Sequence, residues 1–267
     1  MEARHGKDAA ARRLADQLER SRASRLRQYD ADGLRPEFAA LTKWQARRLE
    51  HTYCDLWTQD RYRPAVEFFL ADLYGAKDYS ARDEGVERVY PIMSRMMPNA
   101  ALDVLALGIE LHALSQELDL DMIAMIWGEM NAGERLDAEV YAEAYRRCGD
   151  VDERRRQIAL VEQVGRSLDD VVFRPLVYNA VRLARTPARL AGFHALHDFI
   201  ERGFETFRHM RGAGEFLDVV TERETAVMEA ILDQRPIEEW APPELMGAAS
   251  RARAGPGAGR PSGAGRG

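Results

Sequence analysis

The feature that most constrains the fold is a pattern of apolar residues that recur at three- and four-residue steps from residue 36 to about 234. That spacing lines up apolar side chains on one face of an α-helix, whereas a half-buried strand needs strict alternation. No stretch of the chain shows sustained alternation. Prolines and glycines interrupt the pattern where helices are expected to begin and end. The sequence therefore predicts an all-α fold.

This punctuation divides the chain into about eight to ten helices, which we expect to pack as a bundle or array in a single globular domain. The most apolar of them has leucines almost all around its circumference and is predicted to be the central helix. The expected helices cover residues 36–60, 65–74, 80–97, 100–118, 122–131, 137–147, 152–173, 175–185, 187–210 and 214–234.

Charge and complexity divide the chain into three parts. We expect a basic N-terminal helical extension over 1–35, the all-α globular domain over 36–247, and a disordered tail rich in Arg, Gly, Pro and Ala over 248–267. The net charge of −6 is uneven, because both ends are basic and residues 36–250 carry about −13. An acidic body disfavours nucleic-acid binding and leaves only the basic tail for that role.

The sequence gives no sign of export or membrane insertion. The N-terminus lacks the apolar run of a signal peptide, and charged residues interrupt the apolar stretch 100–127 in a way that a bilayer disfavours. Cys54 and Cys148 stand alone without CxxC spacing, so neither a disulfide framework nor a zinc knuckle is expected. We expect a cytoplasmic protein that does not enter membranes.

No pattern in the chain is better explained by catalysis than by a structural role. The sequence has no Gly-x-Ser-x-Gly elbow, no Gly-rich phosphate loop and no Gly-x-Gly-x-x-Gly fingerprint. Hydrolase, kinase and dehydrogenase functions are therefore disfavoured, and no catalytic residue is predicted. We expect a non-enzymatic protein, a structural or protein-interaction module that binds a protein partner or itself.

Three ionisable residues, His112, His197 and Glu224, project onto apolar helix faces. Burying an ionisable group is costly, so such positions are candidates for a functional role. Glu201 lies one helical turn after His197 and adds a carboxylate. The alternative function is therefore a haem- or metal-binding helical protein that uses His112, His197, Glu201 and Glu224. The competing structural explanation keeps each histidine as a core residue hydrogen-bonded to a carboxylate and pairs Glu224 with an arginine. No other cofactor is predicted.

A line of acidic residues at seven-residue steps runs along the predicted central helix. It consists of Asp103, Glu110 and Glu117. Cation binding is one explanation of this line. Solvation, or pairing with arginine, explains it equally well.

The segment 61–75 reads Arg-Tyr-Arg-Pro-Ala-Val-Glu-Phe-Phe-Leu-Ala-Asp-Leu-Tyr-Gly and resembles the signature of a family of uncharacterised bacterial proteins named for an FFLEELY motif. Ala71 and Asp72 replace the Glu-Glu pair of that motif. The resemblance covers about 35–235 and implies an α-helical domain without an established activity, ligand or catalytic residue. The positions that match, with the glycine that follows them, are Phe68, Phe69, Leu70, Leu73, Tyr74 and Gly75.

The motif also has a physical explanation. Phe69, Leu70 and Leu73 share one helix face and are expected to fill the core. Phe68 projects the other way, so its helix is either sandwiched between two layers or contributes to an oligomer contact. We predict that Phe68 and Tyr74, with the groove around them, form the contact surface for a protein partner.

Overall fold

The computed structural model describes residues 17–24, 26–30, 33–73, 85, 88, 99–133, 135–248 and 250–251. Predictions that concern other positions lie outside this description. They include the start of the N-terminal extension, most of the helix expected at 80–97, residues Tyr74 and Gly75 of the motif, and the tail beyond 251.

The part of the chain that the structure describes is helical except for one short strand pair, in which β1 (Tyr29–Asp30) lies antiparallel to β2 (Gly33–Leu34). The all-α prediction is confirmed. The elements that follow are α2 (Pro36–Thr52), α3 (Cys54–Trp57), α4 (Arg63–Phe68), the π-helical turn η1 (Phe69–Leu73), α6 (Asn99–Ile123), the π-helical turn η2 (Ala124–Glu129), α7 (Ala138–Cys148), α8 (Val151–Val172), α9 (Pro175–Leu190), α10 (His194–Met210), α11 (Gly214–Leu232), and the 3₁₀ turns η3 (Ile237–Glu239) and η4 (Pro243–Leu245).

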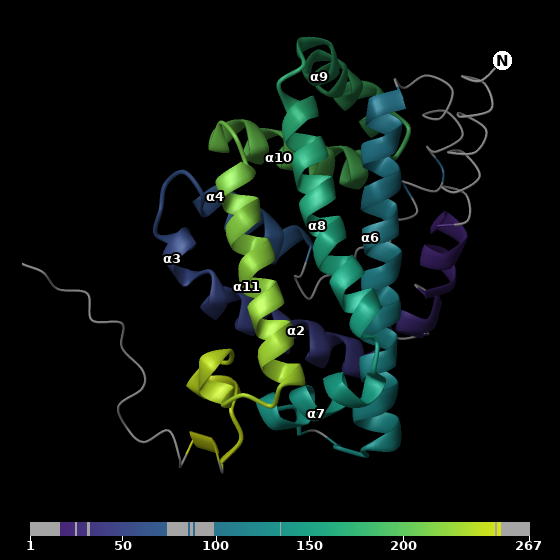
Figure 1. Ribbon diagram of the computed structural model, residues 1–267. Helices are drawn as coiled ribbons and strands as arrows, with labels where there is room; N and C mark the ends of the chain where they lie inside the picture. Colours follow the sequence, from purple (N-terminus) through teal and green to yellow (C-terminus); the bar gives the residue numbers. More distant parts are fainter. Residues whose placement is uncertain are drawn as a thin grey trace, which may run out of the picture.

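Three long helices, α6, α8 and α11, lie side by side and form the frame of the molecule, with α8 in the middle (Figure 1). α7 packs against α11 at one end of this frame, and α2 crosses near the same end. At the other end α10 packs on α8 and α4, and α9 packs on α10. Among the helices that the structure describes, none is long and apolar enough to cross a membrane.

The apolar core consists of two clusters. The Trp44 cluster joins α2, α7 and the ends of α6 and α11, and in it the indole of Trp44 stacks on Tyr141 with ring centroids 4.0 Å apart. The Phe207 cluster joins the end of α2, α4, the end of α8, α10 and the start of α11. On α2 and α11 the charged residues Arg48 and Glu224 fall between the positions that belong to the two clusters. A polar layer therefore interrupts the core.

Capping residues position α7 as the sequence predicts. The carboxylate of Asp137 accepts a hydrogen bond from the backbone N–H of Val140 at 3.0 Å, which satisfies a free donor at the helix start. Gly149 ends the helix with φ 73°, a left-handed conformation that glycine adopts without a steric cost. Asp137 and Gly149 are therefore enough to predict where α7 starts and ends.

The boundary predicted at Pro187 is wrong. Pro187 does not open a new helix but lies inside α9, which continues to Leu190. The chain turns instead at Gly192, whose φ is 81°, before α10 begins. Pro187 has no backbone N–H, so the carbonyl of Leu183 receives no helical hydrogen bond. Leu183 is 78% exposed, so water can donate to this carbonyl instead.

Two further helix boundaries also differ from the prediction. Asp119 and Asp121 do not start a new helix, because α6 continues past them to Ile123 and then widens into the π-helical turn η2. The burial of Leu120 and Met122 keeps this part of the helix against the core. The helix expected at 36–60 is interrupted by a turn at Tyr53, which separates α2 from α3.

The acidic line on α6 is paired with arginines where its partners are described. Arg20, in the helical segment 17–24, donates to Glu117 at 3.0 Å. Arg156 of α8 lies 2.6 Å from Glu110. The arginine-paired explanation of the line is therefore confirmed for Glu110 and Glu117, and Asp103 is exposed.

Candidate functional site

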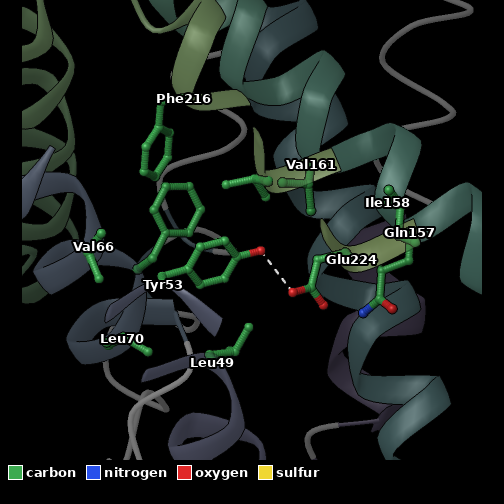
Figure 2. A pocket seen from close by; sticks show the side chains of 11 residues that line it. Leu49, Tyr53, Val66, Leu70, Gln157, Ile158, Val161, Phe216 and Glu224 are labelled. Atoms are coloured by element: carbon green, nitrogen blue, oxygen red, sulfur yellow. Dashed lines mark hydrogen bonds between the residues drawn. The ribbon is translucent and has the colours of Figure 1, made fainter. Parts of the chain in front are cut away.

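A buried ion pair forms the centre of the polar layer and joins α2 to α11. Both terminal nitrogens of Arg48 donate to the carboxylate of Glu224 at 2.8 Å, and the hydroxyl of Tyr53 donates to the same carboxylate at 2.8 Å (Figure 2). Burial alone would raise the pKa of Glu224, but Arg48 and these hydrogen bonds hold that pKa below its ordinary value. The pairing of Glu224 with an arginine, expected as its structural explanation, is confirmed.

A second set of polar groups lies beside this pair, on α6 and α8. Gln45 of α2 donates to the carboxylate of Asp119 at 2.9 Å, and Gln157 donates to the hydroxyl of Ser115 at 2.8 Å. Burial raises the pKa of the Asp119 carboxyl, and this outweighs its bond to Gln45. The protonated form of Asp119 is therefore favoured more than that of an ordinary aspartate.

Arg154 of α8 is the second buried cation of the layer, at 7% exposure. Its guanidinium lies 4.6 Å above the ring of Tyr145 and donates to the backbone carbonyl of Leu118 at 3.5 Å. Within the described part of the chain, no carboxylate lies within 4.0 Å of its nitrogens. Arg154 thus differs from Arg48, whose charge is matched by a carboxylate at hydrogen-bonding distance.

Two neighbouring cavities occupy this region. The first holds about 70 Å³ and has apolar walls, with the carboxylate of Glu224 and the hydroxyl of Tyr53 on one side (Figure 2). The second holds about 80 Å³, and its lining includes Arg154, Asp119 and Glu224. The residues that line both cavities are Leu49, Gln157, Ile158 and Glu224.

A different cluster of ionisable groups lies where α9 meets α10. The Nε2 atom of His197 is 2.8 Å from the carbonyl oxygen of Val181, and because a carbonyl only accepts, Nε2 must donate. The other ring nitrogen, Nδ1, is buried without a hydrogen-bond partner in the described structure. It lies 4.0 Å from a carboxylate oxygen of Asp198 and 3.9 Å from one of Glu201.

These three residues offer atoms that lie within 4.8 Å of one another, which is compatible with one metal ion. Two arginines of α9 approach the same carboxylates. Arg185 donates to Glu201 at 2.6 Å, and Arg189 lies 4.0 Å from Asp198. The cluster therefore holds α9 against α10 in the structure as it stands.

The structure brings together two of the four residues expected to hold a cofactor. His197 and Glu201 are neighbours, whereas Glu224 is in the polar layer and half-buried His112 lies on α6 outside the cluster. The hydrogen bond of His197 goes to a carbonyl and not to a carboxylate, contrary to the structural expectation. Asp198 belongs to the same acidic and histidine-rich helix but was not among the four predicted residues, because the residue after His197 projects about 100° around the helix from the apolar face.

The FFLEELY-like residues pack within the chain. Phe68 is 8% exposed and stacks on Phe199 of α10 with centroids 5.4 Å apart, close to the backbone of Gly203. Phe69 is half-buried beside Phe216. Of the two arrangements considered for Phe68, the structure shows the helix sandwiched between two layers. Leu70 is also buried, as expected.

α9 has an exposed apolar face that the sequence analysis did not single out. Leu176, Leu183 and Leu190 are spaced by seven residues and are 86%, 78% and 86% exposed; we call them the outer leucine line. Val177 and Val181, on the adjoining part of the same apolar arc, pack against the Phe207 cluster. None of the sixteen residues of α9 is buried.

Comparison with known proteins places the chain in a family. No curated protein and no solved structure matches it. Residues 24–238 match a family described as a domain of unknown function, DUF8198. The matched residues include the frame helices, the polar layer and α9. The function of this family is unknown, which agrees with what the resemblance implied. The FFLEELY motif itself stays a prediction. The chain belongs to this family, the domain of unknown function DUF8198.

Proposed function

We propose that this protein is a non-enzymatic interaction module that binds a protein partner through the outer leucine line of α9. The observation that carries the proposal is the exposure of Leu176, Leu183 and Leu190, each at least 78% exposed and all on one helix face. Single exposed leucines are ordinary, but an aligned set on a helix is typical of a contact surface.

This proposal moves the expected contact surface away from Phe68. Phe68 is covered by Phe199 and Gly203 of its own chain, so a partner could not reach it without opening the contact between α4 and α10. Tyr74 lies outside the described residues. The outer leucine line needs no such rearrangement, because it is already exposed.

The charges of α9 indicate what kind of partner would fit. The helix contains Arg182, Arg185 and Arg189 and no acidic residue. Arg185 and Arg189 are already paired with Glu201 and Asp198 of α10, so Arg182 is the cation of this helix that a partner could meet. A symmetric contact between two copies of α9 would bring the two Arg182 side chains together, which is unfavourable. An amphipathic helix of another protein, with an apolar face flanked by glutamates, would complement both the leucines and Arg182.

The area available predicts a modest affinity. Burying three leucines and three apolar partners contributes roughly 9–18 kcal/mol, of which association consumes at least about 4 kcal/mol. Side-chain ordering reduces the remainder further. We therefore expect a dissociation constant of about 10–100 µM.

A designed peptide tests the proposal. The probe is a labelled synthetic four-heptad helix with leucine at positions a and d and glutamate at e and g, and its binding is followed by fluorescence anisotropy. We expect Leu183→Glu to abolish binding. Leu26→Glu is the matched control, because Leu26 is 69% exposed but lies outside α9. Absence of binding to the unmodified protein, or equal loss in both variants, would contradict the proposal.

Two further measurements identify the class of partner. The same peptide with lysine in place of glutamate should not bind, because its charges would face Arg182 of α9. Sedimentation velocity should show that the protein alone does not self-associate through this face. Self-association that Leu183→Glu abolishes would replace the acidic partner with a second copy of the chain.

Divalent metal binding at His197, Asp198 and Glu201 is a second candidate function. The specific observation in its favour is the buried Nδ1 atom of His197, which faces two carboxylates without a donor. A bound Zn²⁺ would accept this lone pair. The competing cation is Arg185, so Arg185→Met should strengthen zinc binding measured against a chelating dye. Equal zinc affinity in His197→Ala and the unmodified protein would exclude the site.

A further inference from the structure

Arg154 lacks a partner that matches its burial. A guanidinium has five donors, and here one of them meets a carbonyl at 3.5 Å, the outer limit of a hydrogen bond. The contact with the face of Tyr145 contributes about 2 kcal/mol when desolvated, less than a buried cation needs. Because Arg154 lines the polar cavity, its remaining donors have room for an acceptor.

The two carboxylates that line the same cavity do not provide this acceptor. Glu224 is saturated by Arg48 and Tyr53. Asp119 accepts from Gln45, and its carboxylate oxygens lie more than 4.0 Å from the nitrogens of Arg154. The cavity therefore has one positive charge that no carboxylate of the described chain contacts directly. An anion from outside would complete it.

The neighbouring cavity indicates what would be attached to that anion. Its walls are almost entirely apolar, with Phe69, Val161 and Phe216 among them, and it begins where the two cavities share Leu49 and Ile158 (Figure 2). A dry apolar cavity of about 150 Å³ is enough to hold a benzene-sized molecule. The two cavities share part of their lining, and their combined volume is about that of such a cavity, so we size the ligand as a short carboxylic acid of about six carbons.

We propose that the paired cavities bind a short-chain monocarboxylate, with its carboxylate on Arg154 and its apolar chain in the apolar cavity, against the walls that Val161 and Phe216 form. The hydroxyl of Tyr145, which also lines the polar cavity, has no hydrogen-bond partner elsewhere in the described structure and supplies a second donor. This site goes beyond the protein contact on α9 and shares no residue with it.

Calorimetric titration with sodium hexanoate tests the site. Hexanol and hexylammonium serve as neutral and positively charged probes of the same length. Hexanoate should bind with a submillimolar dissociation constant and at least tenfold more tightly than either. Equal affinity for hexanol, or no heat from hexanoate up to about 10 mM, would overturn the proposal, and neither comparison depends on a variant that must fold.

Variants then assign the roles of the residues. Arg154→Met should weaken hexanoate binding at least tenfold, whereas Arg155→Met should leave it unchanged, because Arg155 is exposed and pairs with Asp152 away from the cavity lining. Asp119→Asn removes the nearby negative charge and should strengthen binding. Unchanged affinity in a folded Arg154→Met variant would refute the assignment. Leu183→Glu should still bind hexanoate, which separates this proposal from the one on α9.

Discussion

Replacing Glu224 by alanine should be among the most damaging single changes in the polar layer. The substitution removes two bonds from Arg48 and one from Tyr53, each 2.8 Å long. Arg48 is 8% exposed and would be left as an unpaired buried cation. Breaking a buried pair from one side costs about 3–5 kcal/mol. Because the side chain of Glu224 keeps 22% exposure, we expect the lower end, about 3 kcal/mol.

A double-mutant cycle isolates the pair. Urea unfolding at pH 7 would compare the unmodified protein with Glu224→Ala, Arg48→Met and the variant that carries both changes. The double variant leaves no unpaired charge, so we expect a coupling free energy of about 2–3 kcal/mol. Glu143→Ala, which breaks the more exposed pairs with Arg146 and Arg147, is the control and should cost less than about 1 kcal/mol.

The effect of Glu224→Ala should also depend on pH. The folded-state pKa of Glu224 lies below its unfolded value, so the stabilisation from the pair is fully present above about pH 4.3 and is lost as pH falls through the folded pKa. The stability difference between the unmodified protein and Glu224→Ala should therefore shrink on acidification below pH 4.3. A coupling below about 0.5 kcal/mol at pH 7, or a difference that does not shrink in acid, would refute the reasoning.

Three other substitutions test the packing through thermal and urea unfolding. Gly165→Ala would place a Cβ atom in steric conflict with the side chain of Leu217, so it should destabilise by about 1–3 kcal/mol. Gly108→Ala meets no neighbouring element within 4 Å and should stabilise by up to about 1 kcal/mol. Equal effects of the two would contradict the close approach of α8 and α11. Phe68→Ala should cost about 3–5 kcal/mol of folding stability, and a cost below 1 kcal/mol would mean that it is not a core residue. Asp137→Ala should cost about 1 kcal/mol through loss of its cap, and Asp137→Asn should restore most of it.

The sequence predicted that Glu224 is paired with an arginine but not which arginine it is. Apolar periodicity placed Glu224 on a buried face, and the general rule that buried carboxylates are paired predicted an arginine. Nothing in a chain so rich in arginine distinguishes Arg48 or Arg154 from those on the surface. Their roles depend on which helix faces which, and so they became visible only in the packed structure.

The sequence predicts that the leucines of α9 are buried, whereas the structure leaves them exposed. Their spacing in the sequence is that of an ordinary amphipathic helix, whose apolar residues are expected to be buried. The apolar arc of α9 is wide enough that only half of it, including Val177 and Val181, reaches the core. Which half is covered depends on how α9 meets α10, and this is partly set by His197 and Arg185.

The sequence alone determined the helical class, the start and end of α7, and the burial of Leu70. Periodicity, capping and turn chemistry act within a few residues of the chain, so a local pattern is enough to predict them. The tertiary structure decided that Arg48 meets Glu224 across 176 positions, that Phe68 faces inward, and that Arg154 borders a cavity. These are contacts between distant segments, whose energies depend on the relative placement of whole helices, and no local pattern encodes that placement.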